Sequence, residues 1–163
     1  MKKYLFFVTA ALLGLYYLSS MPYEQQTIVP ELRVLLRDQP FYELLSKIEV
    51  SYWGRTISVE TRGYYYFIEF LFRKTMHFVG YGIVAVLLYL LFRKLKWIFP
   101  SIIACICTFF IAALDEYNQT LVEGRTGMFE DVLLDTAGAV TFVLCLKVIS
   151  TIKYLLNRKR SVN

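Results

Sequence analysis

Four long apolar runs, separated by charged segments, constrain this chain more than any other feature of its sequence. A helix needs about 17–25 mostly uncharged residues to cross a hydrocarbon core of about 30 Å, and four stretches qualify: residues 4–21, 75–92, 97–114 and 132–152. Because 57% of the chain is hydrophobic and only 19% is charged, a water-soluble domain of this length could not bury its apolar side chains. The pattern predicts an all-α membrane protein, a four-helix transmembrane bundle that forms a single domain over residues 1–163.

The first apolar run has an alternative interpretation as a secretory signal peptide, because Lys2 and Lys3 precede it. The run is long for such a peptide, and the residues from Leu18 to Pro22 make a poor small-residue cleavage site. We therefore favour a retained membrane helix.

The charged residues predict the orientation of the helices. With four spans, both termini and the connection between the second and third spans lie on one side, which carries basic residues and no Asp or Glu: Lys2, Lys3, Arg93, Lys94, Lys96, Lys153, Arg158, Lys159 and Arg160. The positive-inside rule makes this side the cytoplasm, so we predict a multi-pass protein with both termini cytoplasmic. All 13 acidic residues then fall on the outer side.

The net charge of +5 follows from this topology, since the basic residues form short clusters that flank the membrane. Attraction to anionic lipid of the inner leaflet explains such clusters. We therefore predict membrane lipid as a partner and no binding of nucleic acid.

Residues 22–73 predict a small extracytoplasmic α/β cap between the first and second helices. Leucines at helical spacing indicate short surface helices before Pro40 and over residues 41–47. Apolar and polar residues alternate over 48–59, which predicts a β-hairpin. The aromatic stretch 63–72 predicts an amphipathic lead-in to the second span at headgroup depth. The cap would act as a lid, as a lipid contact or as a structural collar.

Polar residues recur at the outer ends of the last three spans. They are Lys74, His77 and Tyr81 on the second span, Glu116 and Gln119 at the end of the third, Arg125 in the next loop, and Asp131 and Asp135 on the fourth. Offsets of three and four place the members from each helix on one face. Since an ionisable group inside a bilayer costs about 3 kcal/mol, such groups usually face other helices and have partners there.

This pattern predicts an outward-facing polar pocket, in which Lys74 and Arg125 neutralise acidic residues such as Glu116 and Asp131. An ion-pair network that only locks the helices together would give the same pattern, so both interpretations stay open.

The pocket residues suit either binding or acid–base chemistry. The candidate catalytic residues are His77, Glu116 and Asp131, because an imidazole beside carboxylates can transfer protons. No serine or cysteine nucleophile signature accompanies them. Together with Asp135 they carry donor atoms for a divalent ion, but a single histidine makes a poor zinc site. We therefore predict no cofactor and assign no metal site from the sequence.

The polar residues follow one another in a characteristic order along three consecutive spans. The matching pieces are Arg73, Lys74, His77, Phe78 and Tyr81, then Asp115, Glu116, Gln119 and Arg125, then Asp131, Asp135 and Gly138. This combination resembles the VanZ-like family of bacterial membrane proteins. One residue departs from the family pattern, which commonly has Asn at the position of Asp135.

The resemblance implies a bacterial plasma-membrane protein of the cell envelope, linked to glycopeptide resistance of the teicoplanin type. We expect its outer pocket to bind a lipid headgroup, a lipid-linked cell-wall intermediate or a lipoglycopeptide antibiotic. The alternative is a membrane-embedded enzyme that acts on an envelope lipid through histidine and carboxylate chemistry. A transporter or channel subunit is disfavoured, because the inner halves of the spans are apolar and offer no polar path.

Overall fold

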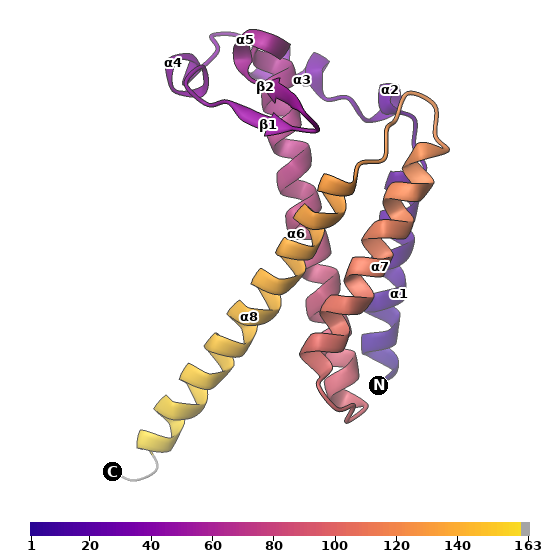
Figure 1. The fold of residues 1–163 in the computed structure, drawn as a ribbon. Helices are drawn as coiled ribbons and strands as arrows, with labels where there is room; N and C mark the ends of the chain where they lie inside the picture. The colour runs from indigo at the N-terminus through magenta and orange to yellow at the C-terminus, as the bar shows by residue number, and fades with distance from the viewer. Residues whose placement is uncertain (161–163) are drawn as a thin grey trace.

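The computed structural model describes residues 1–160 and the side chains of residues 1–158, so the side chains of the predicted flanking residues Lys159 and Arg160 lie outside the described part. Helices dominate the fold, and a small two-stranded sheet lies among the short elements at one end of the long helices (Figure 1). The elements are α1 (Lys2–Ser19), α2 (Tyr23–Gln26), α3 (Val29–Leu35), α4 (Tyr42–Leu45), β1 (Val50–Tyr52), β2 (Arg55–Ile57), α5 (Val59–Arg62), α6 (Tyr64–Lys94), α7 (Pro100–Thr120) and α8 (Phe129–Arg160).

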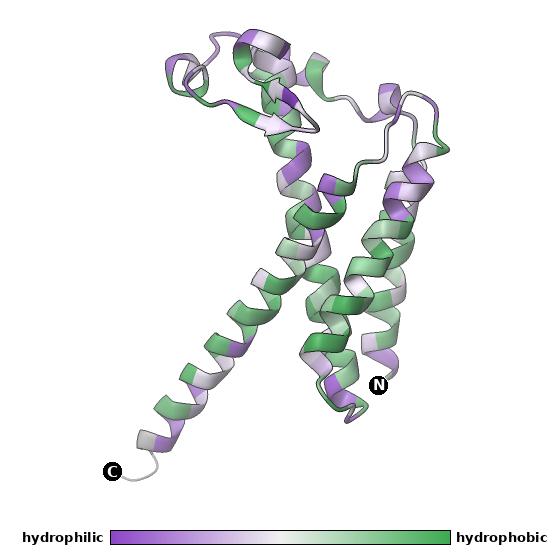
Figure 2. Cartoon of the chain, in the orientation of Figure 1, coloured by the Kyte–Doolittle hydropathy of each residue, from purple (hydrophilic) through white to green (hydrophobic). Residues whose placement is uncertain are grey.

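Three of the helices, α6, α7 and α8, are long and apolar enough to cross a membrane. A fourth candidate span arises if α1 is joined to the segment that follows it, across a bend of 119°. Helix α1 is 18 residues long but begins with Lys2 and Lys3, which lower its mean hydropathy. Figure 2 shows apolar residues along most of the length of the long helices. The chain is therefore a multi-pass membrane protein with three or four spans.

The predicted spans 75–92 and 132–152 lie inside α6 and α8, whereas α7 begins at Pro100, three residues after the start of the predicted span 97–114. All three helices extend beyond the predicted spans at the end nearer the short elements. Helix α6 already begins at Tyr64, so the predicted aromatic lead-in forms its first turns. The preceding Gly63 has a φ of +81°, which only glycine adopts readily, and the chain contains no proline or glycine from there to Gly80. These features explain an uninterrupted helix that begins well before the apolar run.

The predicted hairpin is confirmed by the antiparallel strands β1 and β2, in which Val50 lies opposite Ile57. Trp53 and Gly54 connect them with φ values of +52° and +67°, as in the tight turn that matches the twist of a hairpin. The predicted short helices before Pro40 and after it are confirmed by α3 and α4, whereas α2 and α5 were not predicted.

Helix α6 is the element around which the other long helices pack, since it contacts α8, α7 and α1. The main apolar core lies along its second half and contains Val84, Ala85, Leu88, Tyr89, Ala104, Ala139 and Val143. The second half of α8 diverges from the other helices (Figure 1), and Leu144, Val148 and Ile149 on it are at least half exposed. Helix α8 therefore packs against the other long helices mainly through its first half.

Two glycines let α6 and α8 approach closely where they cross. A Cβ atom added to Gly138 of α8 would overlap the backbone carbonyl of Phe78, and one added to Gly82 of α6 would overlap the ring of Phe142. The rings of Phe78 and Phe142 contact each other edge to face, with centroids 6.2 Å apart. Small residues at such a crossing permit tight packing in a membrane.

We predict that Gly138→Ala lowers the thermal unfolding temperature of the detergent-solubilised protein by several degrees. The added methyl group would push α8 away from the α6 backbone, and overpacking of this kind costs about 1–3 kcal/mol. The matched control is Gly14→Ala in α1, where an added Cβ meets no atom within 4 Å. Equal unfolding temperatures for the two variants would contradict this account of the crossing.

Candidate functional site

Two adjoining cavities lie where the long helices meet the short elements. We call the first, of about 420 Å³, the polar cavity, because charged residues and tyrosines dominate its lining. The second, of about 430 Å³, is the apolar cavity, whose lining includes Leu15, Leu18, Met21, Ile28, Phe72 and Met76. Both cavities are lined by Glu69, Arg73, His77, Gln119 and Arg125, so they share one polar wall.

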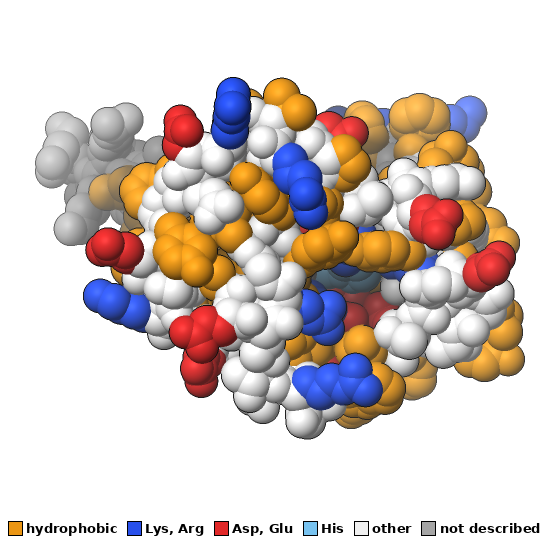
Figure 3. All heavy atoms as spheres, turned by 90° about the horizontal axis from the view of Figure 1, so that it is seen from above, with side chains coloured by type: hydrophobic (Ala, Val, Ile, Leu, Met, Phe, Trp, Pro, Cys, Tyr) orange, Lys and Arg blue, Asp and Glu red, His pale blue; other side chains and the backbone are white. Residues whose placement is uncertain are grey.

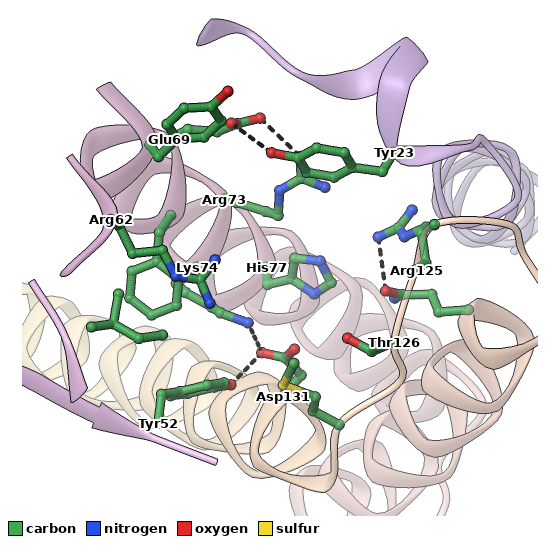
Figure 4. Close-up of a pocket in the computed structure, with 16 residues that line it drawn as sticks. Tyr23, Tyr52, Arg62, Glu69, Arg73, Lys74, His77, Arg125, Thr126 and Asp131 are labelled. Carbon is green, nitrogen blue, oxygen red and sulfur yellow. Dashed lines mark hydrogen bonds and ion pairs between the residues drawn. The ribbon is translucent and has the colours of Figure 1, made fainter. Parts of the chain in front are cut away.

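An ion pair joins α6 to α8 at the edge of the polar cavity (Figure 4). Lys74 Nζ pairs with Asp131 Oδ1, which also accepts a hydrogen bond from the hydroxyl of Tyr52 on β1. The Lys74 ammonium lies 4.4 Å from the centroid of the Tyr52 ring. Burial of Tyr52 and its hydrogen bond to Asp131 raise the pKa of this phenol. The predicted pairing of Lys74 with Asp131 forms, and the hairpin is attached to it.

A second group of ionisable side chains lies deeper, beneath the shared wall. His77 Nδ1 is 3.4 Å from Asp135 Oδ2, and donor atoms of His77, Glu116 and Asp135 all lie within 4.8 Å of one another. Asp135 is fully buried and Glu116 is 4% exposed. Glu116 Oε2 accepts a 2.8 Å hydrogen bond from the backbone N–H of Met128. We call these three side chains the deep cluster.

Gln119 connects the deep cluster to the loop after α7. Its Nε2 donates to Glu116 Oε1 and to Asp115 Oδ2, both at 3.0 Å. Its Oε1 accepts a 2.7 Å hydrogen bond from Arg125 Nη2. The amide thus uses its donor and its acceptor at once, which fixes its orientation in the wall.

Arg125 does not form the ion pair with an acidic residue that the sequence suggested. Its Nη1 donates to the carbonyl oxygens of Leu18 and Ser19 and to Gln26 Oε1, each at 3.2 Å. Carbonyls at the end of a helix lack partners within it, and those of α1 lie within reach of this guanidinium. Burial lowers the pKa of Arg125. The residue therefore ties the end of α1 to the wall of both cavities.

Tyr81 lines the apolar cavity but not the polar one. Its ring stacks with that of His77 at a centroid distance of 6.1 Å. Its hydroxyl is buried and has no hydrogen-bond partner among the described residues. The structure thus brings all eight candidates to one region, in the linings of the two cavities and in the deep cluster.

Glu69 is a central residue that we did not predict for the site. It is 3% exposed, forms an ion pair with Arg73 at 3.0 Å, and accepts hydrogen bonds from the Tyr23 hydroxyl and the backbone N–H of Ile28. Burial and Glu69 together raise the pKa of the Tyr23 phenol. The spacing of four between Glu69 and Arg73 is the sequence signal that predicts such a pair on a helix.

Comparison with known families places these residues in a wider group. A sequence model of the family described as VanZ/LLP1 matches residues 4–150, a range that includes every candidate site residue. No curated protein and no solved structure matches the chain.

We predict that Asp131→Asn lowers the free energy of unfolding by about 1–3 kcal/mol, because it leaves the partly buried Lys74 ammonium without its charged partner. The measurement is thermal or denaturant unfolding of the solubilised protein. The control is Glu130→Gln, which removes the same charge from the same turn of α8 and the same interaction with the helix dipole. Losses of equal size in both variants would show that the ion pair contributes nothing specific.

Proposed function

The chain belongs to the VanZ/LLP1 family of membrane proteins, and from this premise we propose that it binds the anionic headgroup of an amphiphile at the outer face of the bacterial plasma membrane. The class includes a membrane lipid, a lipid-linked cell-wall intermediate and a lipoglycopeptide antibiotic. All three combine phosphate or carboxylate groups with an apolar chain.

The proposed topology has four spans in one domain, with α1 as the fourth and residues 22–63 as an extracytoplasmic cap. Basic residues at the start of α1 and in the α6–α7 connection favour a cytoplasmic location for that end. The opposite end carries the acidic residues and the cap. On this topology the polar cavity faces outward, and both termini are cytoplasmic.

The single observation that carries the proposal is the shared wall between a polar and an apolar cavity of similar size. An amphiphile needs such a pair of neighbouring environments, one for its headgroup and one for its chain. Leu18, Phe72 and Met76 of the apolar cavity are each more than half exposed, so this side is open to surrounding lipid. A chain could therefore enter sideways from the bilayer while the headgroup enters from outside.

The lining of the polar cavity favours an anionic headgroup. Four cationic side chains face two carboxylates there: Arg62, Arg73, Lys74 and Arg125 against Glu69 and Asp131. The side chain of Arg62 has no ion-pair or hydrogen-bond partner among the described residues, which leaves its guanidinium available for a phosphate or carboxylate. Seen from above, the surface is hollowed at this point, with cationic side chains around the opening and the histidine within it (Figure 3).

Glycopeptide resistance of the teicoplanin type fits the same chemistry. A lipoglycopeptide carries a carboxylate-bearing peptide and a fatty acyl chain, and the two cavities would take one part each. Retention of the drug at the membrane would lower its concentration at the cell-wall precursor that it targets.

The alternative function is a membrane-embedded enzyme that acts on an envelope lipid. It is favoured by the imidazole of His77, which lines both cavities and lies beside Asp135. A carboxylate that orients an imidazole is a common arrangement for proton transfer. Chemical conversion of a bound lipid by wild-type protein and its loss in His77→Ala would support this function over binding alone.

We predict that Arg62→Gln weakens binding of a short-chain phosphatidylglycerol by about tenfold, the effect of one charge-assisted hydrogen bond of about 1.5 kcal/mol. The measurement is isothermal titration calorimetry of the full chain in nonionic detergent, with phosphatidylcholine of the same chain length as the comparison ligand. The matched control is Arg55→Gln, which removes a guanidinium from β2 that does not line the polar cavity.

Equal affinities for the two lipids, or equal losses in the two variants, would contradict the proposal. Titration with teicoplanin and with phosphatidylglycerol distinguishes the sources of the headgroup, since the drug would compete with the lipid only if both use the polar cavity.

A further inference from the structure

The deep cluster holds two carboxyl groups around a single imidazole, and of the two only Asp135 forms an ion-pair contact with that imidazole. Glu116 and Asp135 are both buried, and neither of the nearby cations reaches them with an ion pair. Lys74 pairs with Asp131, and Arg125 donates to Gln119 and to backbone carbonyls. Buried carboxylates without a compensating charge are costly, so a bound cation would stabilise this region.

A buried carboxylate oxygen of the deep cluster has no partner. Among the described residues, the side-chain atoms that are buried without a hydrogen-bond partner are Asp135 Oδ1 and the hydroxyl of Tyr81. Both belong to residues in contact with His77, because Asp135 lies 3.4 Å from its Nδ1 and the Tyr81 ring stacks on it. The Tyr81 hydroxyl interacts with Asp115 of α7, whereas Asp135 Oδ1 belongs to the deep cluster itself. Buried polar atoms almost always have a partner, so the free Asp135 oxygen indicates a missing polar group in the cluster.

The spacing of the cluster suits a bound cation. Ligand atoms about 2.1 Å from a tetrahedral metal ion lie about 3.4 Å from one another, and His77 Nδ1 and Asp135 Oδ2 are 3.4 Å apart. The donor atoms of all three residues lie within 4.8 Å of one another. Two ligands on opposite sides of an ion are about 4.2 Å apart when each lies about 2.1 Å from it, so separations of this size are close to those in a first coordination sphere.

Hydrogen bonds already orient one of the three ligands. The carboxylate of Glu116 accepts from the Met128 N–H through Oε2 and from Gln119 through Oε1. Each oxygen keeps a lone pair for a cation, and fixed second partners of this kind are typical of carboxylates that bind metals. We propose that His77, Glu116 and Asp135 bind a divalent transition-metal ion, of the Mn²⁺ or Zn²⁺ type, beneath the floor of the polar cavity.

The structure separates these ligands from the other acidic residues nearby. Asp131 is occupied by Lys74 and Tyr52, and the donor atoms that converge within 4.8 Å of one another belong to His77, Glu116 and Asp135 and do not include Asp115. A set of one imidazole and two carboxylates suits Mn²⁺ and Zn²⁺ better than the soft cations that prefer sulfur. The chain therefore gains a cofactor that we did not predict from its sequence.

An ion at this position places positive charge directly below the proposed headgroup site. The metal site does not depend on that site, because its ligands come from α6, α7 and α8 and not from the cationic lining. A wild-type chain that binds phosphatidylglycerol but no metal ion would contradict this inference alone. A wild-type chain that binds the metal ion but not phosphatidylglycerol would contradict the proposed function alone.

The test is a titration of the full chain, purified with chelator and reconstituted in lipid nanodiscs, with MnCl₂ followed by electron paramagnetic resonance. We expect one Mn²⁺ per wild-type chain, displaced by Zn²⁺. Asp135→Asn and Glu116→Gln each weaken binding by at least about tenfold, because each removes a charged ligand. The matched control, Asp115→Asn, loses the same charge one residue from Glu116 and retains wild-type affinity.

Absence of stoichiometric binding of both Mn²⁺ and Zn²⁺ to the wild-type chain would overturn the proposal. Equal weakening in Asp115→Asn and Asp135→Asn would also overturn it, since binding would then follow net charge alone. Circular dichroism and gel filtration verify the fold of each variant, and Glu116→Gln provides an independent test if Asp135→Asn does not fold.

Discussion

The rest of the structure depends on one constraint: carboxylates that are buried near the ends of membrane helices need polar or charged partners. Asp131 satisfies it through Lys74 and Tyr52, which joins α8 to α6 and to the hairpin at one point. Glu116 and Asp135 lie one layer deeper, around His77. Since an unpaired ionisable group in a bilayer is expensive, these contacts fix how the three longest helices meet at the end nearer the short elements. The glycine-lined crossing of α6 and α8 lies just below and depends on the same alignment.

The short elements are part of the site as well as its cover. Tyr52 comes from β1, and Tyr23 from α2 contacts Glu69 of α6. Arg125 connects the loop after α7 to the end of α1. The polar cavity therefore borders segments far apart in the sequence, and a bound headgroup would contact several of them at once. Binding and stability are coupled for this reason, and a ligand that fills the cavity should stabilise the cap together with the helix ends.

The sequence predicted the parts of the structure that follow from local patterns. Apolar runs located all four long helices, α1 included. Period-two alternation located the hairpin, and helical offsets placed Asp131 and Asp135 on one face, which meets α6. It could not predict partners that are remote along the chain. Arg125 was expected to meet an acidic residue but binds α1 carbonyls, because only the folded chain brings that helix end within reach. Tyr52 lies 79 residues from its acceptor, and no local pattern specifies such a contact.

The central claim is that the polar cavity faces outward and receives an anionic headgroup. Its most direct test is the accessibility of Thr126, an exposed residue in the lining of that cavity. Thr126→Cys would be introduced into a chain whose three native cysteines are replaced by alanine, and intact cells would be treated with a membrane-impermeant maleimide. We expect labelling from outside, slowed by phosphatidylglycerol in the purified protein. Labelling only after the cells are permeabilised would mean that the cavity faces the cytoplasm and would contradict the account.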